Sequence, residues 1–264
     1  MKFDSILENK LPGSIDWTIP KGLEIDDELQ IFVEGGVVHK GQEVVFRGTS
    51  SNIEGNQCVV RIFRLGWYNG TGARSIVDSE KLTIEYGETW KKTDLPNNSL
   101  IEQGPKWPVV FSKIVPNDWC DGMYVAKFES IQGGSILVPF WLTSPNEAEG
   151  LCICLSPLNI QSRNWWGGAS STQVINGKPK RKRTLYHTIG TPLLSINRPM
   201  YNARGGDFLR WAYPLVRFLE RHDIPVTYIT DIDIEAGGEI PESITNLVTV
   251  GPMRYWTQTF DNSV

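Results

Sequence analysis

The stretch SINRPMYNARGGDFLRWAYPLVRFLE, residues 195–220, decides the fold of the second half of this 264-residue chain. A turn rich in glycine and asparagine, residues 202–206, precedes a segment whose apolar side chains recur at spacings of three and four: Phe208, Trp211, Leu215, Phe218 and Leu219. That spacing predicts an amphipathic helix. Asp207 is the expected N-cap, because its carboxylate can accept the free amides of the first turn. Pro214 is expected either to kink the helix or to mark its true first turn.

The segments around this helix predict a parallel sheet. A β-branched run, residues 225–230, follows the helix, and residues 151–156 and 246–250 are further apolar runs. A helix followed by a buried strand indicates a βαβ arrangement, with residues 151–156 as the central strand of an open α/β sheet of the Rossmann or flavodoxin type. The polar stretch 143–150 contains proline and glycine, so we place a domain boundary there and assign residues 147–264 to the α/β domain.

The first half, residues 1–146, contains short β-rich runs separated by turn signals of glycine and asparagine: 43–50, 58–68, 81–86, 107–115, 122–130 and 135–144. Their even spacing predicts an antiparallel, immunoglobulin-like β-sandwich. Pro139 demotes the last run to an edge strand or a bulge. Trp67 and Tyr68 lie in a glycine-rich loop that could bind a ligand, but packing of both side chains against the neighbouring domain is the favoured interpretation.

Composition and charge exclude several classes of protein. A net charge of −4 is too small to indicate a nucleic-acid or membrane partner, and no apolar run is long enough to span a bilayer. The N-terminal sequence lacks the apolar region of a signal peptide, so we expect a cytoplasmic protein. The four cysteines show no CxxC spacing and are expected to be reduced and buried: Cys58, Cys120, Cys152 and Cys154. The basic run KPKRKR, residues 178–183, could bind nucleic acid or an anion, although a solvated hairpin tip is favoured.

Three polar loops are predicted to converge on one crevice. In an open α/β sheet the ligand crevice lies beyond the carboxyl ends of the strands, which here lead into residues 156–168, 231–235 and 251–256. Asp231 and Asp233 end a strand at this crevice and could hold a cation or a hydroxylated ligand, but a capped turn explains them equally well. The histidines lack the spacing of zinc ligands, which argues against a zinc site of that kind.

Four motifs carry a family resemblance through their order and spacing: RIFRLGWYNGTGAR (61–74), NIQSRNWWGG (159–168), the stretch 195–222 and GPMRYW (251–256). They resemble, in turn, the β-sandwich signature, the Trp-Gln-Ala-Tyr-Asn-Asn-Trp-Gly-Gly motif, the central block and the Gly-His-Asp-Glu-Tyr-Trp motif of one family. That family is the large (beta) subunit of N,N-dimethylformamidase and its relatives.

The resemblance implies an amidase with a mononuclear iron, held by two tyrosines and a glutamate, that acts as a Lewis acid on a small amide. One ligand position is retained as Tyr201. The other tyrosine falls on Arg163 and the glutamate on Arg254. Arginine donates hydrogen bonds and stays charged, so it cannot ligate iron, and we expect no metal or other cofactor. The family's chains continue past the third parallel strand, so we also expect a truncated sheet.

Three hypotheses follow. The favoured one is a degenerate, metal-free homologue that binds a small anionic ligand or a partner chain. An oligomer or a heteromer would cover the incomplete sheet. The alternative is an active iron-dependent amidohydrolase, completed by a partner chain, in which the retained block would be catalytic: Tyr201, Asn202, Arg204 and Asp207. A weaker alternative is a carbohydrate-binding β-sandwich protein.

The favoured hypothesis predicts an anion-binding pocket. Arg163 and Arg254 should both point to the place where the family holds its metal, and two buried guanidinium groups need a negative partner. Asp231 or Asp233 could be that partner, or a carboxylate or phosphate ligand could be gripped bidentately. The remaining predicted lining residues supply aromatic walls, an amide and backbone N–H groups: Asn164, Trp165, Trp166, Gly167, Gly168 and Trp256.

Overall fold

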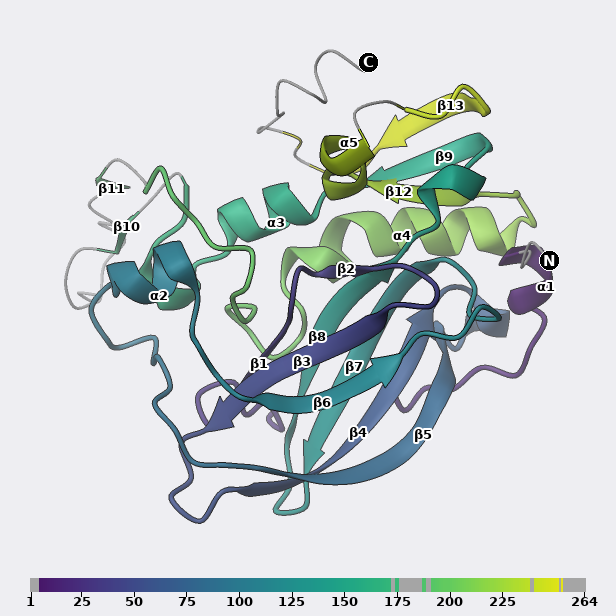
Figure 1. Cartoon of the computed structure of the whole chain (residues 1–264). Coiled ribbons are helices and arrows are strands. Elements are labelled where there is room, and N and C mark those ends of the chain that lie inside the picture. Colours follow the sequence, from purple (N-terminus) through teal and green to yellow (C-terminus); the bar gives the residue numbers. More distant parts are fainter. Residues whose placement is uncertain are drawn as a thin grey trace.

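The protein consists of two stacked antiparallel and mixed sheets with a small parallel sheet beyond them (Figure 1). This computed structural model describes residues 5–171, 174–175, 187–188, 191–237, 240–251 and 253. The short elements are α1 (Ser5–Glu8), α2 (Asn98–Gln103), β10 (Val174–Ile175) and β11 (His187–Thr188), together with 3-10 turns at Tyr68–Gly70, Pro145–Glu147 and Trp166–Gly168. The result is a β-rich fold in two parts, as the sequence predicts at that level.

The larger of the stacked sheets has five strands in the order β2 (Val37–Val38), β8 (Ser135–Leu142), β7 (Gly122–Ser130), β4 (Asn56–Leu65) and β5 (Ala73–Ile84). The smaller has the order β1 (Leu29–Val33), β3 (Glu43–Ser50) and β6 (Val109–Ile114). Phe46 of β3 bridges the two sheets, because its ring lies 5.6 Å from that of Phe128 and 5.8 Å from that of Phe140. These alternating apolar side chains form the core between the sheets.

Pro139 occupies a position that a proline can tolerate. It lies in β8 opposite Val125 of β7, and on the other side β2 pairs only with Trp141 and Leu142. Among the described residues no strand therefore lies beside Pro139 on that outer side, where its missing N–H costs no ladder bond. The strand β8 is thus not an edge strand as a whole, because β2 lies beyond its end, but Pro139 faces an unpaired stretch of its outer side.

The parallel sheet has β9 (Gly150–Leu155) at its centre, between β12 (Thr227–Thr230) and β13 (Ile244–Thr249). Its central position is the predicted one. The helices of this part are α3 (Pro157–Arg163), α4 (Asp207–Arg221) and α5 (Asp231–Gly237). The helix α4 lies between the parallel sheet and the five-stranded sheet (Figure 1). Phe208 of α4 packs against Trp141 of β8, with ring centroids 4.9 Å apart.

The start and interior of α4 differ from expectation. Pro214 lies inside one continuous helix, so it does not mark the first turn. Asp207 is the first helical residue, and the N-cap is Gly206, which has a positive φ of 57° and provides no side-chain cap. The predicted capping role of Asp207 is therefore wrong. Its carboxylate is bound to the side chain of Arg163, from another helix.

A buried charge network joins the two parts of the molecule. Arg64 of β4 donates from Nη2 to Glu220 Oε1 of α4 at 2.7 Å, and both side chains are 0% exposed. Arg64 Nη1 donates to the hydroxyl of Tyr68 at 2.9 Å, and the Tyr228 hydroxyl donates to Glu220. The guanidinium groups of two α4 arginines lie over the Trp67 ring, so the predicted packing against the second half is confirmed for Trp67. The division of the chain at residues 146 and 147 stays a prediction.

The cysteines are buried and free, as expected. Burial raises the pKa of the Cys152 thiol to about 11 and that of the Cys58 thiol to about 12, which makes both poor nucleophiles at neutral pH. Over the described parts of the chain, we found no helix of the length and apolarity that crossing a membrane requires.

Candidate functional site

The candidate site is a pocket of about 360 Å³ between the end of α3 and the start of α4. We call it the Arg163 pocket. It is lined by residues from α3, from the turn before α4 and from the first turn of α4: Ile160, Arg163, Asn164, Trp165, Met200, Tyr201, Asn202, Gly206, Asp207 and Arg210. Most of the site residues predicted in the stretches 163–165 and 201–207 therefore meet in one pocket.

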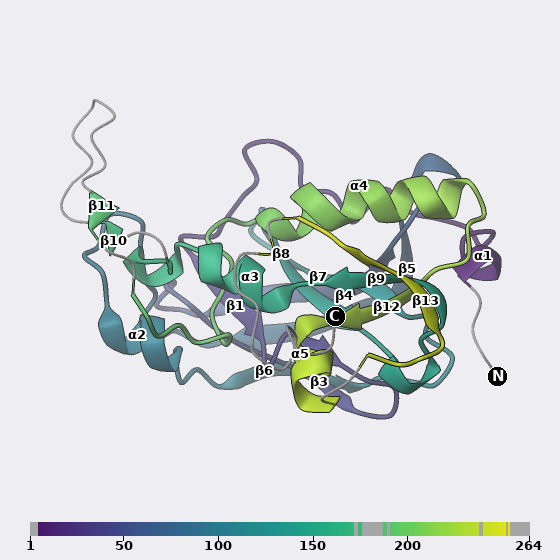
Figure 2. The same ribbon diagram turned by 90° about the horizontal axis from the view of Figure 1, so that it is seen from above.

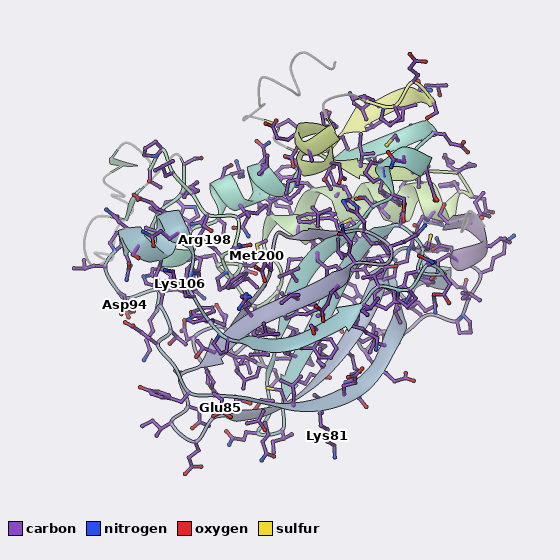
Figure 3. All side chains as sticks on the ribbon, in the orientation of Figure 1. Lys81, Glu85, Asp94, Lys106, Arg198 and Met200 are labelled. Carbon is purple, nitrogen blue, oxygen red and sulfur yellow. The ribbon has the colours of Figure 1, made fainter. Side chains whose placement is uncertain are left out.

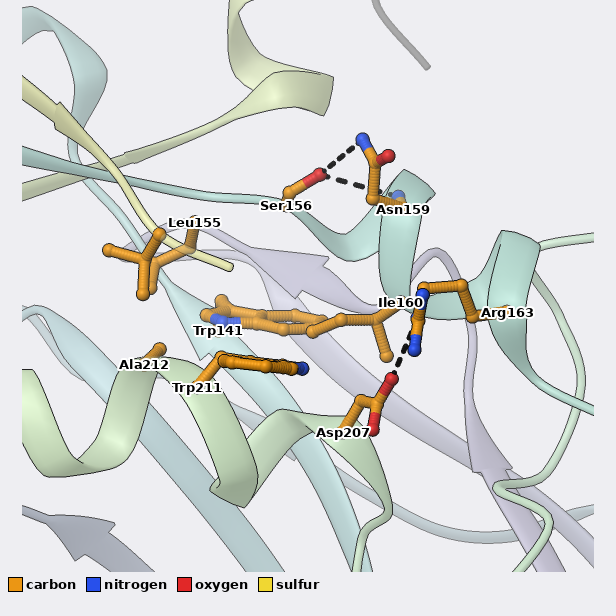
Figure 4. A pocket seen from close by; sticks show the side chains of 10 residues that line it. Trp141, Leu155, Ser156, Asn159, Ile160, Arg163, Asp207, Trp211 and Ala212 are labelled. Atoms are coloured by element: carbon orange, nitrogen blue, oxygen red, sulfur yellow. Dashed lines mark hydrogen bonds and ion pairs between the residues drawn. The ribbon is translucent and has the colours of Figure 1, made fainter. Parts of the chain in front are cut away.

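An ion pair crosses the pocket. Ser156 caps α3, its hydroxyl accepting from Asn159 N at 3.3 Å, and this helix ends at Arg163. Arg163 Nε donates to Asp207 Oδ2 at 2.9 Å, as Figure 4 shows, and the two side chains are 30% and 24% exposed. Beside the pair lies an apolar cavity of about 20 Å³ between Trp141 and Trp211, which is room for about one water molecule. Each helix thus delivers one charge to the pocket.

Asn164 positions the turn that carries Tyr201. Its Oδ1 accepts from Tyr201 N at 2.9 Å, while its Nδ2 donates to Pro199 O at 2.7 Å and to Gln161 Oε1 at 2.9 Å. Because these bonds engage both ends of its amide, Asn164 lines the pocket mainly as a structural residue. The Tyr201 ring is half-buried, and Lys92 Nζ lies 5.2 Å from its centroid.

Arg198 holds the base of the same turn. It is 1% exposed and donates only to backbone carbonyls within the described residues: those of Ser195, Trp166, Ala169 and Gln161. Burial away from any carboxylate lowers its pKa to about 10. Figure 3 shows Arg198 and Met200 close together where the turn approaches α2 and α3. No sequence pattern distinguishes this buried arginine from an exposed one.

Asn202 and Arg204 have different roles from each other. Asn202 Oδ1 accepts from Arg204 N at 3.0 Å and from Gly206 N at 3.1 Å, which closes the turn before α4. The exposed Arg204 side chain points away and pairs with Glu24. It lines a neighbouring pocket of about 620 Å³ and not the Arg163 pocket, so the structure does not bring it together with the other site residues, and a catalytic role for it stays a prediction.

Arg210 is the site residue that the sequence did not reveal. It lies one turn after Asp207, lines both pockets and is exposed. Its guanidinium lies 4.9 Å from the ring centroid of Trp211, and no carboxylate among the described residues pairs with it. The Arg163 pocket thus holds two guanidinium groups and one carboxylate, a formal excess of one positive charge. The spacing of three from Asp207, which places both on one helix face, was the signal available.

Trp166, Gly167 and Gly168 lie outside the pocket, which corrects their predicted place. Trp166 is buried, donates from Nε1 to Gln30 and packs its ring against two other tryptophans. A Cβ on Gly167 would meet Ile101, and one on Gly168 would meet the backbone of Pro96. These glycines serve close packing between two chain segments, so their backbone N–H groups do not line the Arg163 pocket.

Asp231 and Asp233 do not pair with Arg163, so that part of the prediction is also wrong. Asp231 accepts from the Ser156 hydroxyl, and burial raises the pKa of its carboxyl to about 6. Asp233 Oδ2 accepts from Thr230 N at 2.8 Å, while Asp233 N donates to Thr230 Oγ1 at 3.1 Å. This reciprocal pair is a capping box at the start of α5, so the capped-turn interpretation is confirmed for Asp233. Arg254, Trp256 and the run 178–183 lie outside the described residues.

The comparisons with known proteins give one match that covers most of the chain. The family described as "N,N-dimethylformamidase beta subunit-like, C-terminal" matches residues 59–264. No curated protein matches. Two solved structures show weak similarity. A Pseudomonas fluorescens alkylpurine DNA glycosylase, AlkC, bound to DNA containing an abasic site analog has 14% identity and a TM-score of 0.24, over 44% of this chain and 31% of its own.

The second is a Paenibacillus sp. cycloisomaltooligosaccharide glucanotransferase complexed with cycloisomaltoheptaose, with 11% identity and a TM-score of 0.28, over 76% of this chain and 27% of its own. The chain thus spans less than a third of the length of either solved chain. Similarities this low carry no weight for fold or function.

Proposed function

The chain belongs to the N,N-dimethylformamidase beta subunit-like family, and from that premise we propose that it is a degenerate member that binds a small anion where the family is expected to hold iron. One observation supports this most directly. Arg163, at the position of a family tyrosine ligand, lies in the same pocket as the retained Tyr201 and is bound by Asp207. A cation has replaced a metal ligand.

The residues of the pocket do not fit the implied iron. A guanidinium group has five N–H donors and no lone pair to offer a metal. The carboxylate nearest to it, Asp207, is already engaged by Arg163 at 2.9 Å. A divalent or trivalent cation placed beside Tyr201 would also be repelled by Arg163 and Arg210, which line the same pocket. No step through a metal is therefore proposed for this chain.

The pocket has features that suit an anion. Arg210 has no described carboxylate partner and supplies the excess positive charge. The pocket also receives the start of α4, a helix of 15 residues whose N-terminus has no side-chain cap. The free N–H groups and the dipole of a helix start favour negative charge. A volume of about 360 Å³ suits a small carboxylate or phosphate. A bidentate grip by a guanidinium group would add orientation.

An amidohydrolase remains the second candidate, because the retained Tyr201 lines the same pocket as Asp207. Under that alternative a different ligand set or a partner chain would complete the site. We also propose how the two parts of the fold are built. The two stacked sheets would form an immunoglobulin-like sandwich, and the sheet around β9 would form part of a Rossmann or flavodoxin-like domain.

Calorimetric titration with acetate and with inorganic phosphate tests the proposal. We expect the wild-type protein to bind at least one of them, and Arg210→Gln to weaken that binding at least about tenfold, because the substitution removes the unpaired charge. Arg47→Gln is the matched control, since Arg47 lies on β3 in an exposed pair with Glu34. Equal binding by wild type and Arg210→Gln would overturn the proposal. Stoichiometric iron in the purified protein, together with turnover in a screen of small amides, would establish the amidohydrolase alternative.

A further inference from the structure

The outward face of α4 carries an apolar stripe. Trp211 is 38% exposed, Phe218 is 55% exposed, and the exposed Pro214 lies between them. Spacings of three and four place these side chains along one line of the helix. Figure 2 shows α4 at one margin of the molecule, with its outer side uncovered by other ribbons. We call Trp211, Pro214 and Phe218 the α4 stripe.

Three arginines accompany the stripe, and the guanidinium group of each lies over an aromatic ring. The guanidinium of Arg210 lies 4.9 Å from the ring centroid of Trp211. Those of Arg217 and Arg221 lie 5.2 and 4.9 Å from the ring centroid of Trp67. No carboxylate in the described part of the chain pairs with any of the three. Arg210 and Arg221 are exposed, so their N–H groups remain able to bind a carboxylate. Arg217 is half-buried and donates from Nη2 to Gly70 O at 3.1 Å, so its charge acts on this face at longer range.

The carboxylates of α4 are already engaged elsewhere. Asp207 is bound by Arg163, and Glu220 is buried against Arg64. The outward face of α4 therefore bears three positive charges with no neutralising carboxylate of its own helix, on a protein whose net charge is −4. Local positive charge on an acidic protein favours an acidic partner at this face.

We propose that the α4 stripe and its three arginines dock an acidic amphipathic helix of a partner protein. The stripe is a narrow seam of the kind that a second helix covers, with apolar residues along its centre. The arginines recur at spacings of seven and four, so glutamates at the same spacings on a neighbouring helix could reach them, as flanking charges do in coiled coils. Pairing of α4 with its own copy would instead set arginines near arginines, which disfavours a homodimer through this face.

Fluorescence anisotropy with a designed probe tests this inference. The probe is a labelled peptide of about three heptads, with leucine along one seam and glutamate beside it. We expect the full-length protein to bind it, with an affinity that falls as salt rises. The double variant Phe218→Ser, Arg221→Gln should bind at least about tenfold more weakly, because it removes the most exposed ring of the seam and one stacked charge. Arg210 stays unchanged, since it also lines the Arg163 pocket.

The controls distinguish specific binding at α4 from non-specific binding. The matched variant Ile131→Ser, Lys81→Gln removes an apolar side chain that is 64% exposed, against 55% for Phe218, together with an exposed cation. Lys81 lies away from α4, as Figure 3 shows, so this variant should bind like wild type. A probe with lysine at every glutamate should not bind. Circular dichroism checks that each variant is folded, and Arg221→Gln alone should still weaken binding. Equal binding of the two probes, equal affinity of both double variants, or binding of an oligonucleotide or an anionic vesicle in place of the acidic probe would overturn the inference.

Discussion

Replacement of Glu220 by glutamine should strongly destabilise the protein. The Arg64 and Glu220 side chains are 0% exposed, and Arg64 Nη2 lies 2.7 Å from Glu220 Oε1. Glu220→Gln keeps the size of the side chain but leaves the Arg64 guanidinium buried without its counter-charge. Besides Glu220, this guanidinium donates to two uncharged groups, the Tyr68 hydroxyl and the Asp121 carbonyl. Breaking a buried pair from one side costs about 3–5 kcal/mol.

Equilibrium unfolding in urea measures this effect directly. The free energy of unfolding should fall by about 3–5 kcal/mol, and the midpoint of thermal unfolding by roughly 6–10 °C, at roughly 2 °C per kcal/mol for a chain of this size. Glu34→Gln is the matched control, because it breaks the exposed pair with Arg47 and should cost less than about 1 kcal/mol.

A second variant identifies the cause. The double substitution Arg64→Met, Glu220→Leu removes both charges, so it should be more stable than Glu220→Gln despite the larger chemical change. The reasoning is refuted if Glu220→Gln unfolds within about 1 kcal/mol of wild type, or if the double variant is the less stable of the two.

Two further predictions concern the second half of the chain. Burial raises the pKa of the Asp231 carboxyl from 3.8 to about 6, so the folded protein favours the protonated form. The stability that this carboxyl contributes is therefore complete below pH 3.8 and is lost as the pH rises through 6. Between pH 4 and pH 7 the free energy of unfolding should therefore fall less for Asp231→Asn than for wild type, by roughly 3 kcal/mol at most. Urea unfolding at both pH values measures this, and an equal fall for the two proteins would contradict the prediction. Gly168→Ala should destabilise by about 1–3 kcal/mol, because Gly168 has a φ of 95° and a Cβ there would lie 2.7 Å from Pro96 Cα. Gly133 has a φ of 101° and open space around it, so Gly133→Ala is the control for backbone strain alone. If the two variants lower the midpoint of thermal unfolding equally, the clash with Pro96 contributes nothing.

The sequence predicts elements whose signals are local. The six β-rich runs of the first half and the three parallel strands each coincide at least in part with an observed strand, because alternation and apolar runs are read within a few residues. The poorest match is β5, which begins at Ala73, whereas the predicted run was 81–86. The strand β1 was missed, since all five of its residues are buried and no alternation marks it. The strand β2 has only two residues, too few for any pattern.

The candidate site was harder to predict because its contacts are not local. Asp207 matches a helix cap, yet its partner Arg163 lies 44 positions earlier and competes for the same carboxylate. Trp166 lies beside glycines in a motif that suggests a pocket. Its side chain is instead buried and donates to Gln30, which lies 136 positions earlier in the chain. The motifs identified which residues gather, whereas tertiary partners decided which of them face the pocket.

The four backbone carbonyls bonded to Arg198 bear on how far the chain between them can vary in length. One side chain joins the carbonyls of Gln161, Trp166 and Ala169 to that of Ser195, so the two ends of the intervening stretch are fixed to each other at their base. The entropy of closing a loop grows slowly, by about 0.6 kcal/mol for each doubling of its length. A change in the length of the chain between Ala169 and Ser195 should thus leave the Arg163 pocket in register.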